Sequence, residues 1–300
     1  MFKSILEDFK GVFRSGNMLS KIIVVNVIVF VVVNLLFVID MNSSKDPSSF
    51  ANIILRKISM VSDPWSYIKQ FWGLVTHIFV HKAFGHIFWN MLLLYWFGRI
   101  VGDFLNDRRV LPLYLLGGIA GGIAYFLYAQ VVGGESQAMG ASAAVMCMLM
   151  VAATTSPDYT LRLILIGPVK LKYVALVLLF LDVVGVGGSV NTGGHIAHLG
   201  GAFFGVFYVY LLRKGTDLTD PIQKVIEKIT SINQPKSRKT PRSTFTVYKN
   251  TTSTDKASKS KGTFSQQGEL DRILDKINAN GYDKLTAEEK EFLYQASKKK

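Results

Sequence analysis

The sequence IIVVNVIVFVVVNLLFVI, residues 22–39, decides the fold class of this 300-residue chain. It holds no charged side chain, and about 20 apolar residues in a helix are enough to cross the ~30 Å hydrocarbon layer of a bilayer. Lys21 and Asp40 flank the stretch, and no cleavage site of small residues follows it. We therefore expect a retained transmembrane helix here and not a signal peptide.

Further apolar stretches predict an all-α membrane protein with six transmembrane helices. They lie at about 84–102, 111–132, 142–155, 173–187 and 195–212. The fourth stretch is short for a membrane span, so we expect it to be buried among its neighbours. Cys147 is the only cysteine of the chain, which excludes a disulfide framework and a cysteine-based zinc site.

Charge divides the chain into unlike parts: 25 of the first 212 residues are charged, against 30 of the last 88. We predict a cytoplasmic N-terminal segment (1–21), a six-span domain (22–213), an amphipathic helix with a disordered basic linker (214–268) and a small helical hairpin (269–300). Asp220-Pro221 begins the amphipathic helix, and Thr286-x-x-Glu289 is a capping box in the hairpin. We expect the hairpin to dock on a cytoplasmic partner.

The placement of Lys and Arg predicts the orientation in the membrane. With the N-terminus inside, the inner segments hold twelve basic residues and the outer ones five, all in loop 40–83. Both termini are then cytoplasmic, in a plasma (inner) membrane of bacterial type. Residues 50–61 and 65–75 of that loop mix apolar and basic positions, as helices that lie in the lipid interface do. Membrane lipid is thus an expected partner, and nucleic acid is not.

Four polar residues on three spans lie at a common depth. Ser142 is in the first turn of the fourth span and His198 is about one turn into the sixth. His86 opens the second span, with Asn90 one turn further on the same face. At 1.5 Å rise per residue, all four fall within roughly 5–8 Å of depth near the outer side. Polar side chains inside spans are candidates for function.

The chemistry of these residues favours acyl transfer. A serine hydroxyl is a weak nucleophile and needs a neighbouring base. His198 lies in a stripe of small residues, Ala197, Gly201 and Gly205, which lets its helix approach another closely. Ser142 and His198 are therefore predicted to form a dyad without a carboxylate. The backbone N–H of Ser142, the Asn90 amide and the His86 ring could stabilise an oxyanion.

Each of these residues, and several others, also has a structural interpretation. His86 and Asn90 could join helices by hydrogen bonds, and Cys147 is expected to be a small buried hydrophobe. We expect Asp182 to face the outer water or cap its helix, rather than to complete a triad. His77 and His81 have the i, i+4 spacing of metal ligands, but no third and fourth ligand accompany them.

The motifs His86-Ile-Phe-Trp-Asn90, Gly140-Ala-Ser142 and Ala197-His198-Leu-Gly-Gly201 resemble those of the rhomboid intramembrane serine proteases. The resemblance covers about residues 60–212. It implies that Ser142 is the nucleophile, that His198 is the general base, and that His86 and Asn90 line the oxyanion site. Three positions depart from the family: Ala143 replaces the usual Gly, Gly73 an Arg that organises a loop, and Gly102 a Glu.

The sequence thus predicts a serine endopeptidase that cleaves transmembrane substrates near the outer membrane surface, without cofactor or metal. The fifth span is the expected lateral gate, because its end, Gly185-Val-Gly-Gly188, is flexible. One alternative is an inactive rhomboid-like protein that binds membrane clients. A six-span transporter is a second alternative, but the halves show no inverted repeat and the polar residues lie near one face.

Overall fold

A computed structural model describes the chain over the ranges 11–12, 16–40, 46–133, 136–163, 167–188, 191–232, 266–280 and 282–298. Most of the predicted N-terminal segment, the linker between 233 and 265, and Gly281 lie outside these ranges. The chain divides into two compact units, Met1–Ser237 and Arg238–Lys300.

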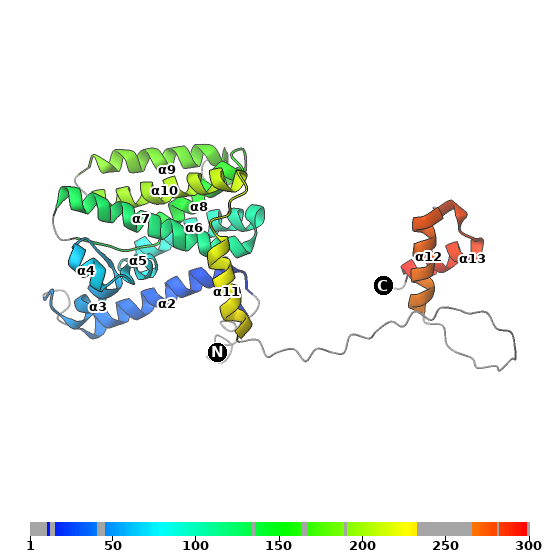
Figure 1. Cartoon of the computed structure of the whole chain (residues 1–300), viewed down its shortest axis with the longest axis horizontal. Helices are drawn as coiled ribbons and strands as arrows, with labels where there is room; N and C mark the ends of the chain where they lie inside the picture. The colour runs from blue at the N-terminus through cyan, green and yellow to red at the C-terminus, as the bar shows by residue number, and fades with distance from the viewer. Residues whose placement is uncertain are drawn as a thin grey trace. The chain divides into compact units, whose positions relative to one another are not determined.

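Helices dominate the first unit, and each of the six apolar stretches forms one (Figure 1). They are α2 (Met18–Ile39), α6 (Phe84–Leu105), α7 (Val110–Val132), α8 (Ser142–Thr155), α9 (Leu171–Val186) and α10 (Thr192–Arg213). Three are long and apolar enough to cross a bilayer by themselves: α2, α7 with the turn before it, and α10. The all-α membrane fold is confirmed, while the count of six spans stays a prediction.

The short helix α8 lies among the other helices, as its length requires. It contacts α6, α7, α9 and α10, and every side chain from Ala143 to Leu149 is buried. Large apolar side chains instead face outward on the flanking helices, including Leu35, Phe180 and Phe203, each more than half exposed. Such flanks are what helices in contact with lipid present.

The segment between α2 and α6 is more broken than the sequence predicts. The helix expected over 50–61 ends early as α3 (Phe50–Ile58), and β1 (Met60–Val61) pairs antiparallel with β2 (Gln137–Ala138). The helix expected over 65–75 is split into α4 (Pro64–Lys69) and α5 (Gly73–Thr76), followed by η1 (His77–Phe79). At Gly73 a side chain would meet the carbonyl oxygen of Ser59 at 2.7 Å, so the chain packs tightly here.

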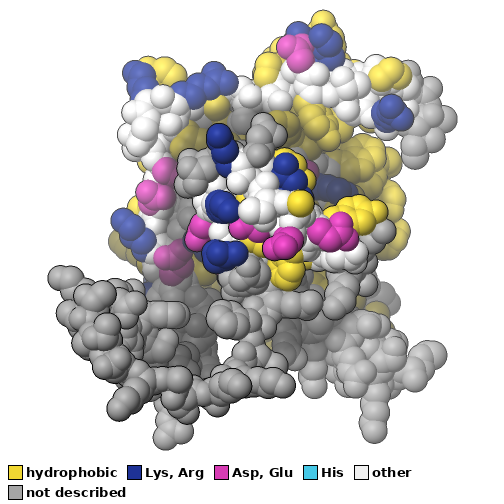
Figure 2. Space-filling view, turned by 90° about the vertical axis from the view of Figure 1, so that its right-hand side faces the viewer, with side chains coloured by type: hydrophobic (Ala, Val, Ile, Leu, Met, Phe, Trp, Pro, Cys, Tyr) yellow, Lys and Arg dark blue, Asp and Glu magenta, His cyan; other side chains and the backbone are white. Residues whose placement is uncertain are grey.

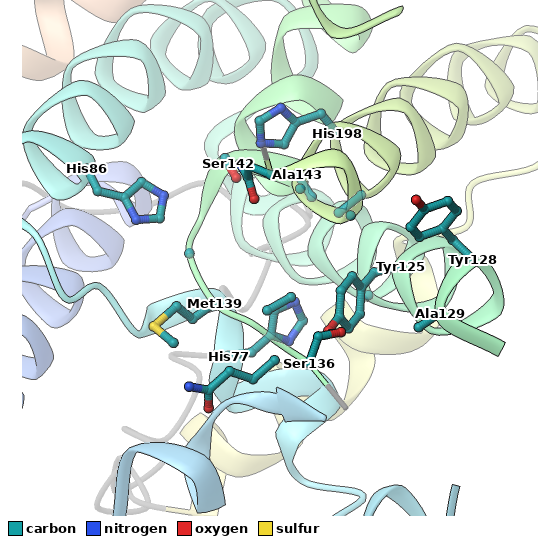
Figure 3. Close-up of a pocket in the computed structure, with 18 of the residues that line it drawn as sticks. His77, His86, Tyr125, Tyr128, Ala129, Ser136, Met139, Ser142, Ala143 and His198 are labelled. Carbon is teal, nitrogen blue, oxygen red and sulfur yellow. The ribbon is translucent and has the colours of Figure 1, made fainter. Parts of the chain in front are cut away.

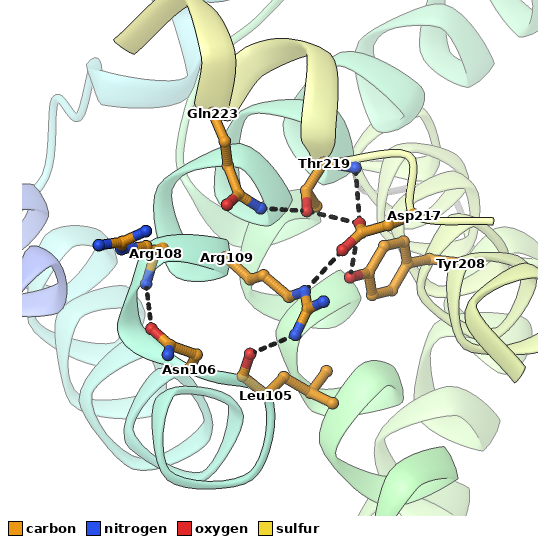
Figure 4. Close-up of polar contacts among 8 residues, drawn as sticks. All are labelled: Leu105, Asn106, Arg108, Arg109, Tyr208, Asp217, Thr219 and Gln223. Atoms are coloured by element: carbon orange, nitrogen blue, oxygen red, sulfur yellow. Dashed lines mark hydrogen bonds and ion pairs between the residues drawn. The ribbon is translucent and has the colours of Figure 1, made fainter. Parts of the chain in front are cut away.

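The opposite end of this unit is held by polar contacts. It contains η2 (Asp107–Arg109), the antiparallel pair β3 (Thr160–Leu163) and β4 (Gly167–Lys170), and α11 (Asp220–Ile232), which lies away from α3 and α4 (Figure 1). Asp217 accepts hydrogen bonds from Arg109 Nε at 2.7 Å and from the Tyr208 hydroxyl at 3.2 Å (Figure 4). Figure 2 shows described side chains of both charges, with Lys and Arg next to Asp and Glu, on the face that it draws.

The second unit contains the predicted helical hairpin. Its helices are α12 (Gln266–Asn280) and α13 (Ala287–Lys298), joined through η3 (Tyr282–Lys284). The capping box is confirmed, because the Thr286 N–H donates to the Glu289 carboxylate at 2.8 Å and the Glu289 N–H donates back to Thr286 Oγ1 at 3.3 Å. Lys276 also donates to Glu289, at 2.8 Å, so this carboxylate joins the two helices.

Candidate active site

A cavity of about 900 Å³ lies between α6, α7, α8 and α10. Its lining includes all four residues that the sequence singles out, Ser142, His198, His86 and Asn90. In Figure 3 the His198 ring and the Ser142 hydroxyl lie on the same wall, and His86 approaches from another. The segment 136–140 and residues near the start of α10 complete the lining. The cavity therefore gathers a hydroxyl, imidazoles and an amide.

A fixed backbone turn places Ser142 at the start of α8. The Gly140 N–H donates to the His77 carbonyl at 2.9 Å, and the Ala141 N–H donates to His81 Nε2 at 3.1 Å. Gly140 has a φ of +125°, and a side chain there would meet the His86 ring at 2.6 Å, so only glycine fits. The turn leaves the first N–H groups of α8 without helical acceptors, beside the Ser142 hydroxyl.

His77 and His81 hold this turn, a role that sequence reasoning missed. His77 Nδ1 pairs with the Gly73 carbonyl at 2.9 Å, and both imidazoles are buried. Burial lowers the pKa of each to about 4, so both are neutral at physiological pH. A neutral His81 can accept from Ala141, which a charged one cannot. Their position before the second span was the available signal, but it did not indicate which groups they would bind.

Glycines bring α10 against α8, as the small-residue stripe predicts. A methyl group at Gly201 would overlap the carbonyl oxygen of Ala143, and one at Gly205 would lie 2.6 Å from that of Cys147. The extra methyl of Ala143 is accommodated because Gly121 on α7 leaves space for it. This departure from the family pattern therefore fits the packing. Cys147 is fully buried, as expected.

The expectation that Asp182 faces the outer water or caps its helix is wrong. Its side chain is buried, and Oδ1 pairs with Nδ1 of His198 at 2.7 Å and with Nδ1 of His195 at 2.8 Å. An ionised carboxylate can only accept, so each Nδ1 carries the proton in these pairs. The free nitrogen of His198 is then Nε2. The predicted dyad thus has a carboxylate on its far side, from α9.

Ser142 and His198 lie close without being joined. Both residues are within the described part of the chain, and there Ser142 Oγ makes no hydrogen bond to the His198 ring. Catalytic hydrogen bonds are often long without substrate and tighten when it binds. The helix contact at Gly201, one turn after His198, keeps the imidazole near the start of α8.

The two predicted oxyanion donors have distinct surroundings. Asn90 is buried and donates one amide hydrogen to the His86 carbonyl at 2.8 Å, which fixes its rotamer and leaves its second N–H. The His86 ring packs against Gly140, two residues before Ser142. Both residues therefore line the cavity together with Ser142. Both also make contacts that would serve a purely structural role.

One cluster has the composition of a metal site. In the described part of the chain, the ligand atoms of Asp182, His195 and His198 all lie within 4.8 Å of one another. Since both imidazoles already donate Nδ1–H to the carboxylate, hydrogen bonds account for the cluster without an ion. His77 and His81 each use one ring nitrogen on the backbone instead.

Comparison with known proteins matches two segments to family models. Residues 68–215 match the rhomboid domain, and residues 260–299 match a family of unknown function, DUF6576. The second segment includes the helical hairpin.

Relatives of the first segment occur in eukaryotes and bacteria. Presenilin-associated rhomboid-like protein A, mitochondrial, of Danio rerio is 29% identical over 45% of this chain and 36% of its own length. RHOMBOID-like protein 12, mitochondrial, of Arabidopsis thaliana is 29% identical over 47% of this chain and 46% of its own length. Rhomboid protease GluP of Bacillus subtilis is 27% identical over 49% of this chain and 27% of its own length. The match thus spans less than half of each relative.

Proposed function

Because residues 68–215 place this chain in the rhomboid family, we propose that it is an intramembrane serine endopeptidase. One observation carries the proposal: Ser142 at the start of α8 and His198 on α10 line the same cavity, with His198 Nδ1 paired to a carboxylate. A serine is activated when its hydroxyl lies beside an imidazole whose other ring nitrogen is hydrogen-bonded to a carboxylate. The multi-pass membrane fold supports a transmembrane protein as the substrate.

The reaction follows from the positions of these groups. Ser142 Oγ attacks the scissile carbonyl while its proton passes to His198 Nε2. The charge that develops on the carbonyl oxygen is stabilised by N–H groups at the start of α8 and by the side chains of Asn90 and His86. His198 then gives the proton to the leaving amine, and water hydrolyses the acyl-enzyme by the same route.

The place of cleavage follows from the predicted orientation. The cavity lies at the end of the bundle where the chain passes from α7 to α8 and from α9 to α10, the loops that carry no Lys or Arg. By the distribution of basic residues this end faces outward. We propose cleavage near the outer surface of a bacterial-type plasma membrane. Since two relatives are named as mitochondrial, membrane fractionation is the test of the location.

A comparison of the wild type with Ser142→Ala tests the activity. Purified protein in detergent is incubated with a transmembrane substrate, and a fluorophosphonate probe is applied in parallel. We expect cleavage and labelling by the wild type and neither by the variant. Client binding without cleavage or labelling would instead favour the inactive rhomboid-like alternative.

A further inference from the structure

Beyond Lys172 and Tyr173, helix α9 carries one buried carboxylate among apolar side chains. Of its sixteen residues only Leu171, Ala175 and Asp182 are buried, so Asp182 is the single buried residue in the half that ends at Val186. Its neighbours Leu181 and Val183 are 54% and 56% exposed. Burying a charge between helices is costly unless hydrogen bonds compensate it, so this position calls for a specific reason.

The partners of Asp182 are two histidines on α10. His195 and His198 are three residues apart, and therefore on one face of that helix. Both donate Nδ1–H to the same oxygen, Oδ1, at 2.8 and 2.7 Å. On α9, Gly185 follows Asp182 by one turn, and a side chain there would meet the His195 ring at 2.5 Å. The surface of α9 is therefore shaped to receive His195 beside the carboxylate.

We infer that Asp182 is a positioning residue for the general base, so that the site works as a Ser–His–Asp arrangement in which α9 must be packed on α10. This rests on the proposed protease function. Because Asp182 holds the proton of His198 on Nδ1, Nε2 keeps the lone pair that receives the Ser142 proton. His195 donates a second hydrogen bond to Oδ1 and so fixes the carboxylate.

The proton balance of the step is simple. As the bond from Ser142 Oγ to the carbonyl carbon forms, the hydroxyl proton moves to His198 Nε2. Asp182 stays ionised and stabilises the imidazolium, because a carboxylate beside a forming cation lowers its energy. The proton then leaves with the amine when the C–N bond breaks. If α9 moves away from α10, this support is lost, so the position of the helix and the alignment of the base are coupled.

Three variants separate positioning from simple helix attachment. Asp182→Leu keeps the size and removes the acceptor, and Asp182→Asn keeps an acceptor oxygen but not the charge. Thr192→Val is the matched control, because Thr192 Oγ1 donates to the Gly188 carbonyl at 2.9 Å and so ties the start of α10 to the connection from α9 without a hydrogen bond to His198. For each protein, kcat and KM for a transmembrane substrate are measured in detergent, together with the Tm.

We expect Asp182→Leu to lower kcat by up to about 10⁴-fold with little change in KM, the loss that changing a triad carboxylate causes. In Asp182→Asn the amide N–H can donate to His198 Nδ1 and leave the ring proton on Nε2, so this variant should also lose kcat by up to about 10⁴-fold. Thr192→Val should keep a wild-type kcat even where its Tm falls.

Two results would overturn the inference while the protease function stands. One is a wild-type kcat in both Asp182 variants. The other is an equal loss in Asp182→Leu and Thr192→Val that follows the Tm, since Asp182 would then only attach the helix. A wild type that neither cleaves substrate nor reacts with a fluorophosphonate refutes the protease function, and the inference falls with it.

Discussion

Gly201→Ala tests whether close approach of α10 to α8 sets the catalytic geometry. The added methyl group would overlap the carbonyl oxygen of Ala143, the residue after the nucleophile. Restoring an ordinary carbon–oxygen contact requires α10 to withdraw from α8 by about 1 Å, and His198 lies one turn away on the same helix. Since a displacement of about 1 Å can cost about 10²-fold in rate, we expect a loss of that size.

The same substitution should also cost stability. Overpacking a tight helix contact destabilises by about 1–3 kcal/mol, which a fall in Tm would report. Gly102→Ala on α6 is the matched control, because its methyl group would meet Val110 Cγ2 at 3.6 Å, an ordinary contact. Helix propensity alone makes that change neutral or favourable by up to about 1 kcal/mol.

The assay is the initial rate of cleavage of one transmembrane substrate in detergent, with the Tm measured on the same samples. Gly201→Ala should lose activity at temperatures where it remains folded, and Gly102→Ala should match the wild type. A Gly201→Ala protein that cleaves at the wild-type rate refutes the reasoning, because the dyad would then not depend on this contact.

Four further predictions use the same measurements. Ser142→Ala and His198→Ala should each remove nearly all cleavage, and the double variant should lose little more; additive losses would argue against a shared mechanism. Asn90→Ala should lower kcat by about 10²-fold if its free N–H reaches the oxyanion, and an unchanged kcat would leave it a helix contact only. Burial alone would raise the pKa of the Asp217 carboxyl, but the hydrogen bonds from Thr219 and Arg109 outweigh it and lower the pKa. The stability it adds is therefore present above about pH 4 and lost as pH falls further, so Asp217→Asn should lower the Tm at pH 7 and less so in acid. Deleting residues 233–300 should leave the cleavage rate unchanged, because the site is built within α6 to α10; a large loss in a folded truncation would mean that the hairpin acts on the bundle.

The sequence predicts the helices of this fold closely because a single property, apolar length, determines them. The predicted stretch 142–155 coincides with α8, and α2 begins only four residues before the predicted span. Asn17 explains that difference, since its side chain accepts from the Ser20 N–H and caps the helix. Pairing between distant segments was not predictable in this way. The strands at 60–61 and 137–138 are two residues long and carry no periodicity to read.

The candidate site was also predictable only in part: the depth of its residues could be predicted, but contacts between distant segments could not. Ser142 and His198 could be placed at one depth because Ser142 opens the fourth predicted span and His198 lies one turn into the sixth, and depth follows from the rise per residue. Helix α10 itself begins three residues before the predicted span, at Thr192. The contact between His81 and Ala141 depends on how two loops meet, about which the sequence says nothing. The local pattern around His81 therefore gave it no definite role, while the fold uses the ring as an acceptor for the turn before the nucleophile.

The position of Asp182 depends on the rotation of α9 about its axis, which the depth of a residue in the membrane does not give. Beyond Lys172 and Tyr173, helix α9 is apolar on every side apart from Asp182, so its sequence has no stripe that marks the packed face. Leu171, Ala175 and Asp182 nevertheless follow one another at four and seven residues, which places all three on one face of a helix. An acidic residue in an apolar span is costly against lipid, and it therefore turns inward when a partner is available. Two histidines in the next span, at the same end of the bundle, are such partners. The rotation of α9 is thus set by its one acidic residue, and that carboxylate is bonded to the base that the proposed reaction uses.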